Sequence, residues 1–429
     1  MPVLRFAIFA SVLWMAASLS AWGQQGVGIP YYNVKAGPVY FTLSSGITTE
    51  YTDNVNLANG TTTPIASELT VNPHFGIDAV SQLQMLALSE SNVNTLSLRM
   101  NFGYRDYVFH PELNQSVTDV QIAPDSELAF LIRTGHVKIR LHDGFGLETD
   151  PPTDGSLSNV AQFRRFTNTF GADTHWDMNS ITGFDLNYAH RNVYALDLVA
   201  LGSSGTAANL NTSNYTNVSD MLTAMAQTKA LSPWLTLGLR GSVQDMRYPQ
   251  APDQDSTTLS YGPFAALQLT DYTSLSASGG VTKSHNGTTF PDAQGDVAAG
   301  SDSSTQYADL SLNNRFNAYY TQTLSIGRET NRSVLGSEMD TNYVRYQSNW
   351  RVNSRITLVF GLFTDDTTDL GIAGAGGHYR LYGGSVSTGL QLSRKLNTSL
   401  AYRYLKKNCD DALESYQQNT VTWSLDYRF

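Results

Sequence analysis

Residues 96–104 read Leu-Ser-Leu-Arg-Met-Asn-Phe-Gly-Tyr, and every second side chain, from Leu96 to Tyr104, is apolar or aromatic. The closing residues 421–429, Val-Thr-Trp-Ser-Leu-Asp-Tyr-Arg-Phe, repeat the alternation. Residues 137–142 and 235–244 have the same pattern. Successive side chains of a β-strand point to opposite faces, so each stretch predicts a strand with one apolar and one polar face. The alternation predicts a chain built from amphipathic strands.

The composition excludes several other classes of protein. Charged residues make up 15% of the chain, against about 25% in soluble domains. A mean hydropathy of −0.24 excludes a bundle of transmembrane helices. The net charge of −10, without a Lys/Arg-rich tract, argues against a nucleic-acid partner. The single cysteine, Cys409, excludes an intrachain disulfide and a cysteine-based zinc site.

The first 23 residues have the features of a signal peptide. A basic start at Arg5 precedes the apolar residues 6–17, and Ala21 and Gly23 supply small residues for cleavage after Gly23. The alternative is a membrane anchor, but this apolar stretch is too short to cross about 30 Å of hydrocarbon. We therefore predict export, with a periplasmic N-terminal segment at 24–38 and a barrel at 39–429.

The connections between the predicted strands alternate in length, which favours an outer-membrane barrel over a soluble sandwich. Tight links are predicted at 134–135, 178–179, 232–233, 271–272, 317–318, 353–354 and 394–395. Long polar links are predicted at 53–65, 107–117, 149–159, 195–218, 248–256, 285–303, 331–339, 367–378 and 408–414. The prediction is an all-β fold, a transmembrane antiparallel up-and-down β-barrel with short periplasmic turns and long extracellular loops. About 18 strands are expected, or 16 if the hairpin around 79–94 is absent.

Aromatic residues support a membrane environment. Those near predicted strand ends suit the girdles at the two membrane interfaces: Tyr51, Tyr107, Trp176, Trp234, Tyr272, Tyr319 and Trp350. The chain ends in Phe429, on the apolar face of its last strand, which resembles the C-terminal assembly signal of bacterial outer-membrane proteins. We therefore expect contact with the barrel assembly machinery, and then with outer-membrane lipid and lipopolysaccharide.

One segment resembles a known family. Residues 46–59, with Tyr51-Thr52-Asp53-Asn54-Val55 at their centre, and residues 69–73, which end in Pro73, are similar to the opening hairpin of the β-barrel porin 2 family. Members of that family are often associated with export of extracellular polysaccharide in Gram-negative bacteria. The resemblance implies polysaccharide passage and partners among exopolysaccharide export components. It carries over no catalytic residues.

The sequence offers little for catalysis or metal binding. The eight histidines form no H-E-x-x-H motif, no G-x-S-x-G is present, and no cofactor or metal is predicted. His142-Asp143 and His190 could be assigned to a hydrolase at the rim, which is the weakest of three alternatives. The acidic runs 365–369 and 253–255 could bind Ca²⁺, but solvated loop acids explain them better. We predict that the chain is not an enzyme.

The favoured function is a passive channel, because barrels of 16–18 strands leave an aqueous lumen. The solutes would be polysaccharide or small anionic or neutral molecules. The second alternative is a structural or adhesion barrel whose lumen is closed by loops. Ten basic residues are predicted to line the pore: Arg99, Arg105, Lys138, Arg140, Arg240, Arg315, Arg345, Arg351, Arg403 and Arg428. The same alternation places only Glu148, Asp309, Asp365 and Asp426 beside them, which predicts a basic wall and a mild anion preference.

Overall fold

The computed structural model of the protein describes residues 32–61, 63–83, 94–114, 120–149, 157–201, 207–210, 212, 215–286, 302–333, 337–370 and 377–429. The predicted signal peptide, and residues 24–31 of the predicted periplasmic segment, lie outside them. The short strand β1 (Val34–Ala36) folds back on the start of β2 (Val39–Thr52). The turn between them needs the positive φ of 60° at Gly37.

Long antiparallel strands form almost the whole of the described chain. Eighteen of them lie in the described residues: β2 (Val39–Thr52), β3 (Glu68–Leu83), β4 (Asn94–Tyr104), β6 (Val120–Thr134), β7 (Val137–Glu148), β8 (Gln162–Asp177), β9 (Thr182–Leu201), β11 (Asn217–Ser232), β12 (Leu235–Arg247), β13 (Ser256–Thr270), β14 (Thr273–Asn286), β15 (Asp302–Arg315), β16 (Tyr320–Arg332), β17 (Glu338–Arg351), β18 (Ile356–Asp369), β19 (His378–Gln391), β20 (Leu396–Cys409) and β21 (Tyr416–Arg428). Two further strands, β5 (Asp106–Tyr107) and β10 (Ala207–Leu210), are short.

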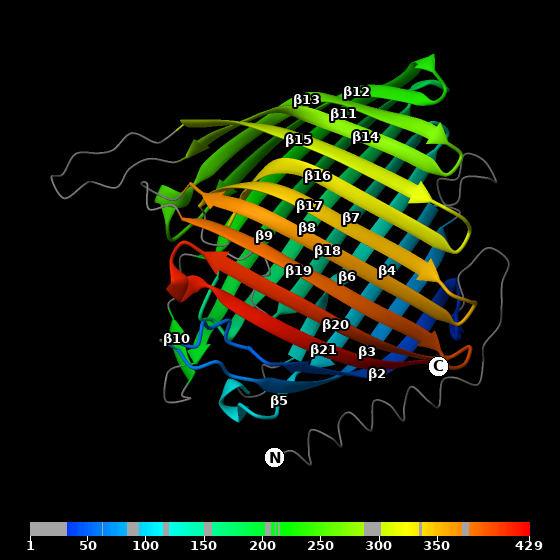
Figure 1. Ribbon diagram of the computed structural model, residues 1–429. Coiled ribbons are helices and arrows are strands. Elements are labelled where there is room, and N and C mark those ends of the chain that lie inside the picture. Colours follow the sequence, from blue (N-terminus) through cyan, green and yellow to red (C-terminus); the bar gives the residue numbers. More distant parts are fainter. Residues whose placement is uncertain are drawn as a thin grey trace.

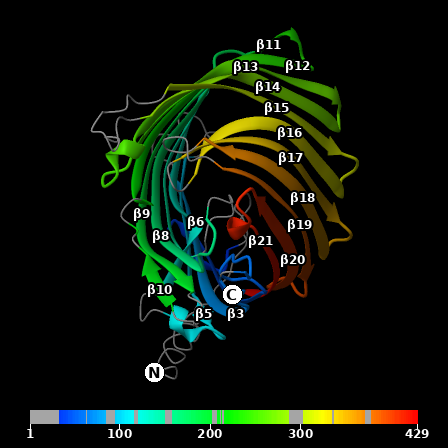
Figure 2. The same cartoon turned by 60° about the vertical axis from the view of Figure 1, so that its left-hand side comes forward.

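The sheet closes on itself. β21 pairs with β2 in a continuous register from Ser44–Arg428 to Thr52–Thr420. Every other long strand pairs with its neighbours in sequence, so the order runs once around the barrel (Figures 1 and 2). The hairpin around 79–94 is present, since β3 and β4 pair from His74–Gly103 to Leu83–Asn94. The predicted fold class and the count of 18 strands are confirmed.

The two ends of the barrel differ. One, here called the turn end, carries the short connections at 135–136, 178–181, 233–234, 271–272, 316–319, 352–355 and 392–395, and the C-terminus lies there (Figure 1). The nine connections that the sequence predicts to be long meet at the opposite, loop end. The prediction for 195–218 was wrong in part, because β9 continues to Leu201 and pairs with β10. Leu198 and Val199 lengthen the strand because they are buried against loop residues.

The outer face is apolar and aromatic. At the turn end, Trp176, Trp234, Tyr272 and Trp350 are all more than 40% exposed, as side chains at a membrane interface would be. Tyr107 departs from the prediction: it is 4% exposed and packs with Leu113. No helix in the described residues is long and apolar enough to cross a membrane. The described helices are single turns in the long connections, η2 (Pro111–Leu113), η5 (Pro252–Gln254) and η6 (Ala412–Glu414).

Candidate functional site

The interior face of the barrel is identified by a cavity that strands from both sides share. A cavity of about 780 Å³ is lined by Arg105 after β4, Arg165 on β8, Arg403 on β20 and Gln418 on β21. Directly paired residues of an antiparallel sheet lie on the same face, so the strand register extends this interior face around the barrel. All ten predicted pore-lining residues lie on this interior face: Arg99, Arg105, Lys138, Arg140, Arg240, Arg315, Arg345, Arg351, Arg403 and Arg428. Their role in permeation stays a prediction.

On one side of the interior, most of the predicted basic side chains contact carboxylates. We call the interior faces of β3, β4 and β6–β9 the paired wall. Arg99 Nε lies 3.1 Å from Asp78 Oδ1, and Arg140 contacts both Glu127 and Asp173. Lys138 and three histidines have carboxylate partners as well. The charges of these pairs therefore cancel at short range, whereas Arg133 and Arg191 on the same wall have no carboxylate within 4.0 Å among the described residues.

The other side leaves most of its arginines without such partners. We call the interior faces of β12–β21 the arginine wall. Arg345 Nη2 contacts Glu329 at 2.8 Å and Asp365 at 3.3 Å. Among the described residues, no carboxylate lies within 4.0 Å of the other predicted pore-lining bases of this wall: Arg240, Arg315, Arg351, Arg403 and Arg428. Many of its remaining interior groups are hydroxyls that bond to one another, such as Ser260 to Thr282 at 2.9 Å.

The predicted count of ten bases against four acids in the interior was incomplete. The strand register and the cavity lining add four bases: Arg133, Arg165, Arg191 and Lys407. The register also adds acids that alternation in the quoted stretches did not reveal: Glu50, Asp78, Glu127, Asp173, Asp185 and Glu329. Most of them belong to the paired wall, where they neutralise the bases that had been counted as surplus. The missing signal was the pairing between strands, because alternation along one strand says nothing about which charge lies opposite.

The connection between β2 and β3 folds into the lumen. Leu57, which has a positive φ of 48°, packs among interior residues of the arginine wall that include Met339, Tyr379 and Leu405. The side chain of Asn54 is 1% exposed and fixes the segment. Its Nδ2 donates to the carbonyls of Ala58 and Gln417 at 2.8 Å each, and its Oδ1 accepts from the amide of Ala58. The second half of the 46–59 motif, residues 53–59, therefore builds a segment inside the barrel.

A second connection meets the first one. The amide of Asn159, between β7 and β8, donates to the carbonyl of Leu57 at 3.1 Å. Ser158 Oγ donates to the carbonyl of Glu414 in η6, and Lys407 Nζ donates to Ser158 Oγ, both at 3.0 Å. Figure 2 shows η6 and the segment after β2 within the outline of the barrel. These contacts join three loops into a constriction near the loop end.

Two cavities flank this constriction, and Arg403 contributes to both. The 780 Å³ cavity is lined by Glu50, Glu148 and Arg165 in addition to Arg403. A second cavity, of about 740 Å³, is lined by residues of the arginine wall that include Arg345 and Arg403. Arg403 has one polar contact in the described residues, a long hydrogen bond of 3.4 Å to Gln418. A positive charge with no carboxylate within 4.0 Å among the described residues therefore borders both cavities.

The acidic run at 365–369 does not form one cluster. Asp365 points inward to Arg345, whereas Asp366 accepts hydrogen bonds from Arg380 and His378 on the outer face. His142 and Asp143 are likewise on opposite faces: His142 lies between Glu127 and Asp173, and Asp143 accepts from Asn168. Among the described residues, no group of three or more His, Cys, Asp or Glu side chains could hold a metal ion.

Phe429 is integrated into the closing strand pair. Its side chain is 4% exposed and its ring packs edge-on against Tyr427, with 5.3 Å between the centroids. Its amide donates to the carbonyl of Leu43 on β2. Phe429 therefore packs where the last strand meets the first, which no pattern within β21 alone indicates. Its role as an assembly signal stays a prediction.

Comparison with known proteins identifies the fold. No family model matches the chain, and no curated protein matches it either. Among solved structures, OccK2 (OpdF) of Pseudomonas aeruginosa in complex with glucuronate aligns with a TM-score of 0.50 and 11% identity, over 91% of this chain and 98% of that one. A BenF-like porin of Pseudomonas fluorescens Pf-5 gives the same TM-score and identity, over 91% and 99%. The chain has the fold of the outer-membrane porins. The resemblance to the β-barrel porin 2 family stays a prediction.

Proposed function

We propose that the protein is a passive channel of the bacterial outer membrane for small anionic solutes. The observation that carries the proposal is the position of Arg403, which lines both cavities beside the constriction without a carboxylate partner in the described residues. A fixed charge in confined water is screened incompletely, so its sign affects which ions enter. The guanidinium group also offers paired donors that fit a carboxylate or phosphate.

The constriction favours small solutes over a polymer. Leu57 and Asn159 hold two loops together inside the lumen, and a glycan chain would have to displace them. The passage of polysaccharide rests only on the resemblance of residues 46–59 and 69–73. The glucuronate in the OccK2 structure suggests a sugar carboxylate as a first probe.

The outer-membrane location belongs to this proposal. The exposed aromatic residues at the turn end and the apolar outer face support it. With the chain in that membrane, the turn end faces the periplasm and the long loops face outward. The barrel assembly machinery, lipopolysaccharide and exopolysaccharide export components stay predicted partners, as do export with cleavage after Gly23 and the absence of enzymatic activity.

A closed structural or adhesion barrel is the second candidate, because the same loop contacts that narrow the lumen could also close it. Purified protein inserted into planar bilayers separates the two functions. We expect discrete current steps in KCl that decrease when millimolar glucuronate is added, and a smaller effect of uncharged glucose at the same concentration. Silence in bilayers that contain folded protein would contradict the channel and support the closed barrel.

A further inference from the structure

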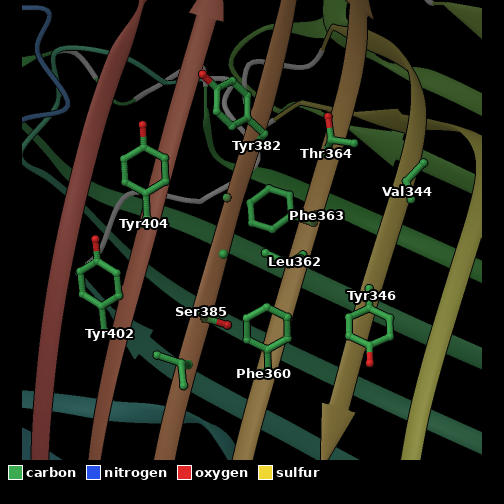
Figure 3. A pocket seen from close by; sticks show the side chains of 13 residues that line it. Val344, Tyr346, Phe360, Leu362, Phe363, Thr364, Tyr382, Ser385, Tyr402 and Tyr404 are labelled. Atoms are coloured by element: carbon green, nitrogen blue, oxygen red, sulfur yellow. The ribbon is translucent and has the colours of Figure 1, made fainter.

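An apolar groove crosses the outer face of β17–β20. It has a volume of about 640 Å³ and is lined by outward side chains that include Tyr346, Leu362, Tyr382 and Tyr404 (Figure 3). The groove exists because Gly384 has no side chain between Leu362 and Tyr404, its direct partners on the neighbouring strands. A Cβ atom at Gly384 would lie 2.9 Å from Leu362 Cδ2. Gly384 therefore leaves a depression in the apolar outer face.

The groove has a charged boundary toward the loop end. Lys406 pairs directly with Tyr382, and its Nζ lies 5.9 Å from the centre of the Tyr382 ring. Among the described residues, no carboxylate lies within 4.0 Å of Lys406. Arg380 lies two residues before Tyr382 on the same outer face, where its Nε donates to Asp366. His378 shares Asp366 and also approaches Asp410, at 3.8 Å.

The tyrosines point toward these charges. In Figure 3, β17 runs downward from the loop end to the turn end, so the top of the picture is the loop end. The hydroxyl groups of Tyr382 and Tyr404 point toward the top, and therefore toward the loop end. A molecule that lay in the groove with its polar end toward the loops would meet two hydroxyl donors, the ammonium group of Lys406 and the terminal nitrogens of Arg380. The apolar groove and the basic side chains at its loop end therefore form one continuous surface.

We infer that this groove binds a phosphorylated acyl lipid of the outer leaflet, with an acyl chain between Leu362 and Tyr404 and a phosphate at Lys406 and Arg380. Hydrocarbon fits the apolar lining, and a phosphate complements the unpaired ammonium group. The inference rests on the proposed outer-membrane location, because the loop end must lie at the headgroup level of the outer leaflet.

The chain supplies matched control variants. Lys283 also lies on the outer face near the loop end without a carboxylate within 4.0 Å among the described residues, but it does not line the groove. Gly241 lies on the outer face of β12, where a Cβ atom would meet only the carbonyl oxygen of Ser260, at 3.8 Å. Lys406→Glu is therefore compared with Lys283→Glu, and Gly384→Leu with Gly241→Leu.

The test is native mass spectrometry of folded full-length protein titrated with bis-phosphorylated lipid A. We expect the first lipid to bind roughly tenfold more weakly to Lys406→Glu, because the substitution removes a cation from beside the lipid phosphate and puts an anion in its place. Gly384→Leu should weaken binding too, and Lys283→Glu and Gly241→Leu should bind as the wild type does. Lipid A without phosphates should lose the preference for the wild type.

Three results would overturn the inference: equal affinity for Lys406→Glu and the wild type, equal binding of dephosphorylated lipid A, or a second copy of the chain on this face in place of lipid. Folding of each variant is checked by its gel mobility without heating. Conductance of the same samples keeps the two proposals separate, since a channel that conducts but has no preferred lipid refutes the groove alone.

Discussion

The paired wall and the arginine wall carry similar residue types on the same kind of strand, yet their charges have different consequences. On the paired wall, Arg99 contacts Asp78, and Arg140 contacts Glu127 and Asp173. The positive charges of these two arginines are therefore balanced by carboxylates within a few ångströms. On the arginine wall, Arg240 and Arg403 have no such partner among the described residues. An arginine in a barrel interior therefore predicts selectivity only when the strands beside it supply no acid.

The largest expected effect is the loss of stability when an arginine is placed on the outer face of a strand that contributes to either wall. Leu98 on β4 and Leu237 on β12 both point outward. We expect Leu98→Arg and Leu237→Arg each to cost about 2–4 kcal/mol if they lie near the bilayer midplane. The inward neighbours give the controls, since Ser97→Arg and Thr236→Arg should be mild. Urea unfolding in lipid vesicles measures all four, and equal tolerance on both faces would refute the assignment of inside and outside.

The next effect concerns the strand pair that closes the barrel, β21 and β2. Deleting Phe429 removes a ring that is 4% exposed and its contact with Tyr427. Burial of such a side chain is worth about 1.5–3 kcal/mol, and we expect less folded protein in the outer membrane. A deletion within 289–299, between β14 and β15 in the sequence, is the control. Equal amounts of both variants in outer-membrane fractions would argue against a special role for Phe429.

A smaller effect is expected from the loop that lies against the arginine wall. Asn54→Ala leaves the buried amide of Ala58 and the carbonyl of Gln417 without their partner, at about 1–3 kcal/mol. The β2–β3 segment should loosen, and the single-channel conductance should rise. Asn59→Ala in the same loop is the control, because the hydrogen bonds of Asn59 are exposed. Unchanged conductance in a folded Asn54→Ala variant would mean that the segment does not limit the pore.

The smallest expected effect is a change in ion selectivity, which compares the two walls directly. One unit charge at about 8 Å in water is worth about 0.5 kcal/mol, so Arg403→Gln should lower the anion-to-cation permeability ratio by about twofold. Removing a whole pair, with Arg99→Gln and Asp78→Asn together, leaves the net charge unchanged and should leave the ratio unchanged. Reversal potentials give both values. A larger shift from the pair than from Arg403→Gln would invert the comparison between the walls.

The fold could be predicted from the sequence because both of its signals are local. Alternation in 96–104 fixes which side chains face lipid, and the unequal links fix the two ends of the barrel. The ten interior bases followed from the same parity. Their partners did not, because Asp78 lies opposite Arg99 only through the register of β3 and β4. The constriction was also not predicted, since the Asn159–Leu57 contact joins loops about a hundred residues apart.

For the motif at 46–59, the sequence indicated a family but not a structural role. The structure gives Asn54 and Asn56 a role as internal ties: Asn56 Nδ2 donates to the carbonyl of Pro64, and its Oδ1 accepts from the amide of Ala66. Each asparagine replaces strand hydrogen bonds that an inward-folded segment cannot make. The motif therefore specifies the shape of the constriction rather than chemistry at it.

The most direct test of the account is the reversal potential of single wild-type channels in a KCl gradient. The account predicts defined current steps and a reversal potential displaced toward the chloride equilibrium value, because unpaired arginines such as Arg403 border the constriction. A displacement toward the potassium value, or no current from folded protein, would contradict it.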